Sequence, residues 1–156
     1  MTAEPFQRVD VAQVDLRTDP RQLPVEPPEP NMATTWEGRD VLWLGPDEWL
    51  VVGQGGEEED IVRSLGDAVA GTQASVLDVS ANRTVFDLAD ALDHLSTACG
   101  LDLDPTRWTP GMCAQTLLGR AQVTLHQRDE RTTRVFVRPS FAGYLVERLG
   151  FARPIS

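Results

Sequence analysis

The sequence predicts an α+β fold with a mostly antiparallel sheet and about three helices. Short apolar runs outnumber helical patterns, tight-turn residues separate neighbouring runs, and three amphipathic segments are widely spaced along the chain. Helices set among antiparallel strands are typical of the α+β class. At 156 residues, the simplest organisation is one domain over residues 1–156, because domains cluster near roughly 100–150 residues.

The rest of the chain is organised around the stretch Ser75–Leu88. Its Val, Leu and Phe residues form two short apolar runs, predicted to be strands, on either side of a polar reversal at Ser80–Asn82. Because a helical segment precedes this stretch and another follows it, we expect two βα-type halves joined by a hinge here. Asp78 and Ser80 flank the reversal. They fit either an acid–hydroxyl pair that faces a ligand or a turn stabilised by short polar side chains, and the turn suffices.

The first half of the chain is expected to contain a strand, a connector, a hairpin and a helix. Val9–Leu16 alternates weakly and is predicted to be an edge strand. Residues 18–37 contain five prolines and are predicted to be an extended connector that wraps its own domain or reaches another subunit, since proline fixes φ and lacks an N–H donor. A Gly-Pro-Asp-Glu turn separates the apolar runs Val41–Leu44 and Trp49–Val52, which predicts a hairpin. Glu57–Ala70 is predicted to be an amphipathic helix.

The second half is expected to contain two helices and three strands. Apolar residues repeat at helical spacing over Asp90–Cys99. Ser140 is expected to cap a final helix that turns Phe141 inward and ends at Gly150. The strands predicted between these helices are Cys113–Arg120, Ala121–Arg128 and Thr132–Arg138.

The charge distribution bears on possible partners. The formal net charge of −10 argues against nucleic acid or an anionic membrane as a partner, because both attract cationic surfaces. Residues 1–119 carry 7 Arg against 21 acidic residues, whereas residues 120–156 carry 7 Arg against 3. This asymmetry suits docking onto other subunits, although a merely solvated acidic surface explains it equally well.

The residue types that are missing narrow the chemistry further. All 14 basic residues are Arg, which excludes a Schiff-base lysine, a P-loop lysine and a lysine general base. Two cysteines do not make a disulfide framework. No run of about 18 apolar residues occurs, and the first residues lack the pattern of a signal peptide. We therefore expect a soluble, cytoplasmic chain.

The candidate reactive residues favour structural roles over catalytic ones. His94 and His126 could meet at a metal ion, but neither has another ligand at a suitable spacing, so surface or packing roles are favoured. Cys99 is expected to fill the core, and Cys113 is the better thiol candidate although nothing near it in sequence supplies a base. The acidic run Glu57–Asp60 is favoured as the first turn of a helix rather than as a cation site.

The four tryptophans are the remaining conspicuous side chains. Trp43 and Trp49 lie in apolar runs and are expected in the core, whereas Trp36 and Trp108 lie in predicted loops and are candidates for contact with a partner. The glycines match neither a dinucleotide-binding nor a phosphate-binding pattern. From the residues alone, we predict no catalytic, cofactor-binding or metal-binding residue in this chain.

Four segments, in this order and spacing, resemble the gamma subunit of heterotetrameric, tetrahydrofolate-linked sarcosine oxidase. The opening VAQVDLRTDP (Val11–Pro20) also fits that family. This sequence departs from the family at two places. It has Ala89-Asp90 where the family usually has a glycine, and Arg138-Pro139-Ser140-Phe141 where the family commonly has Arg-Ser-Phe-Ala. The four segments are LGPDEWLVV (Leu44–Val52), VLDVSANRTVFDL (Val76–Leu88), CGLDLDPTRWTPGMCAQTLLGRAQVTL (Cys99–Leu125) and RPSFAGYLVERL (Arg138–Leu149).

The resemblance implies a fold similar to the folate-binding domain of aminomethyltransferases and a non-catalytic role in an enzyme complex. It implies that the complex oxidatively demethylates sarcosine to glycine and releases hydrogen peroxide. The one-carbon unit leaves as formaldehyde, or as methylenetetrahydrofolate when folate is present. It further implies alpha, beta and delta subunits as partners, with FAD, FMN, NAD, zinc and tetrahydrofolate held by those subunits.

Two other functions compete with this one. A free-standing folate-binding or aminomethyltransferase-like protein would need accessory domains, and the GMCAQT segment (Gly111–Thr116) only faintly resembles the KGCYxGQE-type signature of such proteins. An unrelated small regulatory module that binds an amino acid is the third possibility.

Overall fold

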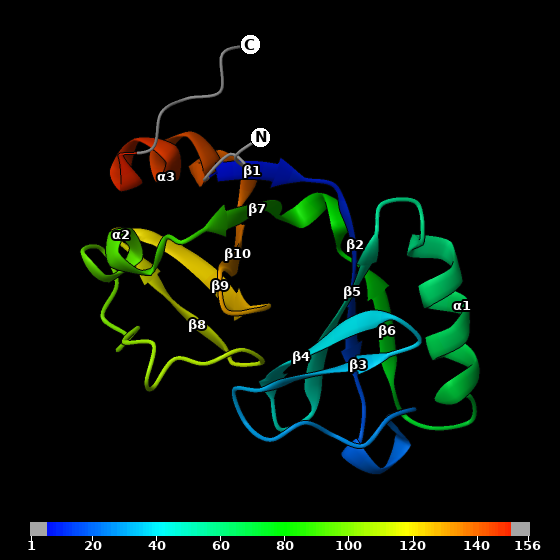
Figure 1. Cartoon of the computed structure of the whole chain (residues 1–156). Coiled ribbons are helices and arrows are strands. Elements are labelled where there is room, and N and C mark those ends of the chain that lie inside the picture. The colour runs from blue at the N-terminus through cyan, green and yellow to red at the C-terminus, as the bar shows by residue number, and fades with distance from the viewer. Residues whose placement is uncertain (1–5, 151–156) are drawn as a thin grey trace. The chain divides into compact units, whose positions relative to one another are not determined.

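The computed structural model describes residues 6–150 and divides them into two compact units (Figure 1). One unit consists of residues 10–81, and the other combines residues 6–9 with residues 82–150. One boundary lies between Ala81 and Asn82, within the stretch that was expected to join two halves. Whether the units form a single domain stays a prediction, and each is described separately below.

The unit formed by residues 10–81 is a five-stranded sheet with one helix. The strand order is β3-β4-β5-β2-β6, and every pair is antiparallel. Aliphatic residues of β2 and β5 pack against Ile61, Leu65 and Val69 to form its core. The elements are β2 (Val11–Arg17), a 3₁₀ turn (Pro20–Gln22), β3 (Ala33–Trp36), β4 (Arg39–Gly45), β5 (Glu48–Gln54), α1 (Glu58–Ala68) and β6 (Ser75–Asp78).

The structure corrects one prediction in this unit and confirms two. The β4–β5 hairpin and helix α1 form as the sequence indicates. The first predicted strand, Val9–Leu16, is not an edge strand, because β2 pairs with β5 on one side and with β6 on the other. The connector over residues 18–37 contains the edge strand β3, which begins three residues after the last proline at position 30 and pairs with β4.

The other unit is a second five-stranded sheet with two helices. Its strand order is β1-β7-β10-β9-β8, again antiparallel throughout. Apolar side chains from one face of this sheet form a core with Leu95, Leu145 and Leu149 of the helices. The elements are β1 (Phe6–Val9), a 3₁₀ turn (Ser80–Asn82) that leads into the unit, β7 (Thr84–Ala89), α2 (Leu92–Ser96), β8 (Cys113–Leu118), β9 (Ala121–Gln127), β10 (Thr132–Val137), a 3₁₀ turn (Pro139–Phe141) and α3 (Ala142–Leu149).

The strands on either side of the reversal at Ser80–Asn82 do not pair with each other. β6 pairs with β2, whereas β7 lies between β1 and β10 (Figure 1). The stretch is therefore a crossing from one sheet to the other and not a hairpin. The 3₁₀ turn at Ser80–Asn82 leads the chain from β6 into the other sheet. Two consecutive strand patterns in a sequence do not show whether the two strands pair with each other.

The helices of this unit differ in detail from the prediction. α2 covers only Leu92–Ser96 of the expected Asp90–Cys99. A 3₁₀ turn at Pro139–Phe141 precedes α3, so Phe141 occupies the N-cap position, no side chain caps the helix, and the expectation for Ser140 is wrong. Phe141 is 38% exposed rather than inward. Gly150 ends α3 in the left-handed conformation, as expected.

Asp90 takes an unusual backbone conformation directly after β7. Its φ is +52°, in the left-handed region that glycine adopts at little cost. The Asp90 N–H donates to the carbonyl of Arg131 at 2.8 Å, and the Arg131 guanidinium bonds the Asp90 carboxylate. Asparagine and aspartate tolerate this region better than other non-glycine residues, so this position can lack the glycine common in the resembling family.

The fold class is confirmed: both sheets are antiparallel, and the described residues contain the α-helices α1, α2 and α3. No helix within residues 6–150 is long and apolar enough to span a bilayer.

Candidate functional site

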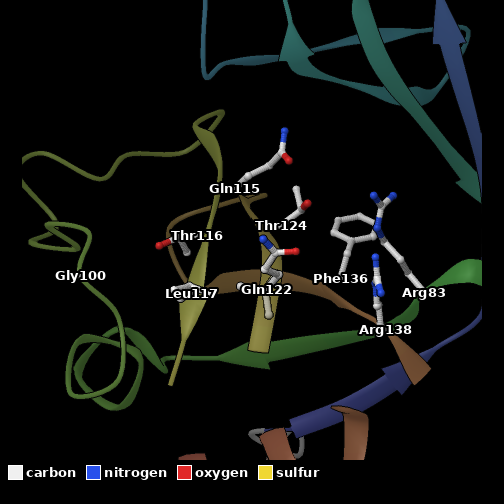
Figure 2. Close-up of a pocket in the computed structure, with 10 residues that line it drawn as sticks. Arg83, Gly100, Gln115, Thr116, Leu117, Gln122, Thr124, Phe136 and Arg138 are labelled. Atoms are coloured by element: carbon white, nitrogen blue, oxygen red, sulfur yellow. The ribbon is translucent and has the colours of Figure 1, made fainter. Parts of the chain in front are cut away.

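A cavity of about 540 Å³ opens on the sheet of the unit that contains residues 82–150. Strands β8, β9 and β10 supply most of its wall, and Arg83 and Arg138 flank it beside Phe136 (Figure 2). Amides and hydroxyls face it from β8 and β9. The lining residues are Arg83, Gly100, Gln115, Thr116, Leu117, Gln122, Val123, Thr124, Phe136 and Arg138.

The strand register places five of the lining side chains in two rows on one face of the sheet. In the first row Gln115 is paired with Thr124, and Thr124 is paired with Phe136. In the second row Leu117 is paired with Gln122. Directly opposite residues in an antiparallel pair have Cβ atoms roughly 4.5–5.5 Å apart, so each row is continuous. This face is the one opposite the helices, because the alternating residues of β9 and β10 form the helical core.

Two arginines extend the second row past the end of the ladder. The last printed pair between β7 and β10 joins Thr84 to Val137, so Arg83 and Arg138 are the next residues on their respective chains. Both follow the alternation that places Phe136 on the cavity face. The fold therefore brings two guanidinium groups, 55 positions apart in sequence numbering, to one cavity.

A third arginine on the same face of the β7–β10 pair has an acidic partner. Arg134 is paired with Asp87, and its Nε and Nη2 donate to the two carboxylate oxygens at 2.8 and 3.0 Å. This bidentate pair is mostly buried and neutralises its own charge. No acidic side chain of the described chain is among the residues that line the cavity. The cavity therefore carries a concentration of positive charge in a chain whose net charge is negative.

None of the histidines and cysteines predicted as candidates is among the residues that line the cavity. His94 is exposed on α2, whereas His126 is buried on β9, on the same strand face as Thr124. Cys113 is buried at 1% exposure, and Cys99 lies beyond the end of α2 with its Sγ 3.6 Å from Thr116 Oγ1. Within residues 6–150, no cluster of three or more His, Cys, Asp or Glu residues is arranged to hold a metal ion.

The Asp78–Ser80 pair forms a turn that is tied to the neighbouring strand. Ser80 donates through its N–H and its hydroxyl to Asp78 Oδ1, at 3.0 and 2.7 Å. Ser80 Oγ also accepts from the N–H of Gln13 on β2 at 2.9 Å. These bonds satisfy the hydroxyl within the fold, as an ordinary turn requires.

The acidic run before α1 is tied into the fold through its first residue. The N–H of Gln54 donates to Glu57 Oε1 at 2.7 Å, and Arg39 donates to Glu57 Oε2 at 2.9 Å. The Gln54 bond and then the Arg39 bond hold the pKa of Glu57 below its ordinary value. The other carboxylates of the run lie in the first turn of the helix, where its dipole favours anions.

The tryptophans are placed differently from the prediction at two positions. Trp49 is in the core as expected, and Trp43 is half-buried beside it. Trp36 lies in β3 and not in a loop, with the Arg39 guanidinium 5.7 Å from its ring centroid. Trp108 is 4% exposed, so it is a core residue and is not available to a partner.

Sequence reasoning missed the cavity. Arg83 and Arg138 are ordinary arginines at the ends of two predicted strands, and only the pairing of β7 with β10 places them at one site. The alternation of polar residues in β8 and β9 indicated which face each side chain takes. It did not indicate that these faces are adjacent.

Comparison with protein families and individual sequences gives one consistent match. Residues 23–152 match the model of the "Sarcosine oxidase, gamma subunit family". Similar sequences include sarcosine oxidase subunit gamma from Corynebacterium sp. strain P-1, 34% identical over 76% of this chain and 58% of the relative, and from strain U-96, 36% identical over 72% of this chain and 55% of the relative. The chain thus spans little more than half the length of these relatives.

Comparison with solved structures supports the same fold. One chain of the heterotetrameric sarcosine oxidase from Corynebacterium sp. U-96, in complex with pyrrole 2-carboxylate, matches with a TM-score of 0.83 and 26% identity over 100% of this chain and 91% of that one. The glycine cleavage system aminomethyltransferase T from Bartonella henselae matches with a TM-score of 0.72 and 13% identity, over 92% of this chain and 44% of that chain. The second match establishes similarity of fold alone.

Proposed function

Because the chain belongs to the sarcosine oxidase gamma subunit family, we propose that it is a non-catalytic subunit that supports assembly of a sarcosine oxidase complex. The observation that carries the proposal is the match of the entire chain to one chain of a heterotetrameric sarcosine oxidase. A chain that matches 91% of one subunit of such an assembly is expected to take part in a similar assembly.

The proposed complex oxidises sarcosine with oxygen and water to give glycine, formaldehyde and hydrogen peroxide. With tetrahydrofolate present, the one-carbon unit is transferred to give methylenetetrahydrofolate. We place the alpha, beta and delta subunits as its partners and the cytoplasm as its location. FAD, FMN, NAD, zinc and tetrahydrofolate are assigned by this proposal to the partner subunits.

The chemistry of the cavity supports a non-catalytic role for this chain. Its polar groups are guanidinium, amide and hydroxyl groups. Arginine stays protonated at all ordinary pH values and cannot act as a general base. A threonine hydroxyl needs an adjacent base to become a nucleophile, and no His, Asp, Glu or Cys is among the described residues that line the cavity. These groups suit binding better than bond cleavage.

Reconstitution tests the proposal. The three partner subunits of a sarcosine oxidase are co-expressed with and without this full chain, and the products are separated by size-exclusion chromatography. We expect the chain to elute with the partners and to raise the yield of complex that releases hydrogen peroxide from sarcosine. A chain that elutes alone, with assembly unaffected by its absence, would overturn the proposal. Tight, saturable binding of tetrahydrofolate by the full chain alone would replace it with a folate-binding function.

A further inference from the structure

We propose that the cavity between Arg83, Arg138 and the β8–β9 hairpin binds a small organic carboxylate with a flat or apolar body. This ligand site goes beyond the proposed assembly role, which requires no ligand in this chain. The argument rests on the pairing of the strands, the residue types along the cavity and its size.

The first step concerns charge. The register places Arg83 and Arg138 at neighbouring positions past the last paired residues of β7 and β10. Like charges at such positions repel each other and destabilise the sheet. Arg138 forms no ion pair with any residue that the structure describes. No Asp or Glu is among the described residues that line the cavity. A bound carboxylate would pair with Arg138 as Asp87 pairs with Arg134, four residues before Arg138.

The second step concerns the shape of the ligand. Guanidinium groups bind carboxylates through two parallel N–H···O bonds, which favours a planar anionic group. Phe136 lies beside Arg83 and is only 1% exposed, whereas Leu117, at the end of the same row as Gln122, is 51% exposed and offers an apolar surface (Figure 2). An apolar body can cover Leu117 while the carboxylate bonds the arginines. A strongly hydrated phosphate would leave that apolar surface uncovered.

The third step concerns orientation and size. Gln115, Gln122 and Thr124 present amide and hydroxyl groups along the two rows. Such groups donate and accept hydrogen bonds and can fix a small polar substituent. The volume of about 540 Å³ lies within the range of roughly 300–1,000 Å³ that small-molecule sites occupy. The observations therefore favour a free small molecule over an extended acidic segment of a partner.

Calorimetric titration of the full chain with benzoate tests the proposal. Benzamide has the same shape without the charge and serves as the matched ligand control. We expect one molecule of benzoate per chain and at least about tenfold weaker binding of benzamide, because a charge-assisted hydrogen bond contributes roughly twice as much as a neutral one. Inorganic phosphate and a hexaglutamate peptide are titrated in parallel.

Variants assign the binding to the cavity. Arg138→Gln is expected to weaken benzoate binding at least about tenfold, and Leu117→Ser to weaken benzoate without changing phosphate. Arg63→Gln removes the same charge from α1, where Arg63 pairs with Asp60 away from the cavity, and is expected to change nothing. Arg83→Gln is a second test if Arg138→Gln does not fold.

Several outcomes would overturn the assignment. Absence of benzoate binding, equal binding of benzamide, or equal effects of Arg138→Gln and Arg63→Gln would exclude a carboxylate site in the cavity. Tighter binding of phosphate would make it a phosphate site, and tighter binding of hexaglutamate would make it a docking surface for an acidic segment. None of these results depends on assembly with partner subunits, so the proposal can fail while the proposed function stands.

Discussion

A buried glutamine at the end of β9 joins three parts of one core. Gln127 Oε1 accepts hydrogen bonds from Trp108 Nε1 at 2.8 Å and from Thr133 Oγ1 at 2.6 Å. Gln127 Nε2 donates to the carbonyl of Asp129 at 2.8 Å. A buried polar group of this kind stabilises a fold only while its partners are in place, because an unsatisfied group costs roughly 1–3 kcal/mol.

Replacing Trp108 by phenylalanine is expected to lower the free energy of unfolding by about 2 kcal/mol, since Gln127 loses one partner and the core loses part of the indole. Urea denaturation followed by circular dichroism measures the change. Trp36→Phe is the matched control and should cost less than about 1 kcal/mol, because Trp36 is only partly buried on an edge strand. Equal losses in the two variants would contradict the role given to Gln127.

A second prediction at this scale concerns the titration of Asp19. The Arg21 side chain bonds its carboxylate at 3.0 and 2.7 Å, and the Arg21 N–H bonds it at 2.9 Å. The side-chain bond and then the backbone bond lower the pKa of Asp19 from 3.8 to about 2. A lowered pKa means that the contribution to stability is present above about pH 3.8 and is lost as the pH falls through about 2.

Arg21→Gln is therefore expected to raise the pKa of Asp19 toward 3.8. Carboxyl chemical shifts in an NMR titration of the full chain report this pKa directly. Arg63→Gln removes an arginine elsewhere and should leave the titration of Asp19 unchanged. An unchanged midpoint in Arg21→Gln would show that another group lowers the pKa.

At the scale of elements, the hydroxyl of Tyr144 joins the β8–β9 turn to α3. The N–H of Arg120 donates to Tyr144 Oη at 3.0 Å, which lowers the pKa of the tyrosine. Gly119 precedes it with φ at +57°, and a Cβ added there would collide with Tyr144 Oη. The turn thus requires glycine both for its backbone conformation and for the approach of the helix.

Gly119→Ala is expected to lower the free energy of unfolding by about 2 kcal/mol, of which about 1 kcal/mol comes from the left-handed backbone. In a Tyr144→Phe background the same substitution should cost about half as much, because the colliding oxygen is absent. Thermal and urea denaturation of the four proteins in this cycle give both values. Gly66→Ala in α1 is the control and should stabilise by about 0.5–1 kcal/mol, because open space surrounds that position.

Local patterns in the sequence predicted the elements better than their partners. The turn at residues 45–48 joins β4 to β5, and the alternation after residue 112 gives β8, β9 and β10. Their pairing follows from short connections, so the sequence suffices. β6 and β7 are also close in sequence, yet each pairs with distant strands. The candidate cavity depends on such distant pairs, which is why neither arginine could be assigned to it beforehand.

At the scale of the whole molecule, the proposed assembly role and the charge asymmetry together predict that acidic residues contribute to association with partner subunits. Reversing Glu59 and Asp60 to arginine is expected to weaken association with partner subunits, since these exposed carboxylates belong to the acidic portion of the chain. Size-exclusion chromatography of the co-expressed subunits at low and high salt measures this, and the effect should shrink at high salt. Reversing Glu130 and Glu147, which are exposed and lie outside residues 1–119, gives the same change in net charge and serves as the control.

A second experiment tests whether the proline-rich connector takes part in association with partner subunits. Leu23 and Val25 pack against the core of their own unit, so residues 26–30 are the part to exchange for a Gly/Ser segment of equal length. We expect this exchange to reduce association as well. Unchanged assembly in both the charge-reversed and the exchanged chains would show that neither the acidic run nor the connector takes part in docking.

The membership of β1 in the second sheet has a consequence for the order in which the chain can fold during synthesis. β1 pairs with β7 from Phe6–Leu88 to Val9–Val85, so β1 is made well before its partner strand. The intervening residues 10–81 form their own unit and can fold while β1 is still unpaired. Closing so long a loop costs only slightly more entropy than a short one, but it delays the contact. The nascent chain therefore carries β1 unpaired and exposed until β7, which ends at Ala89, has been made, and β1 is open to wrong partners during this interval.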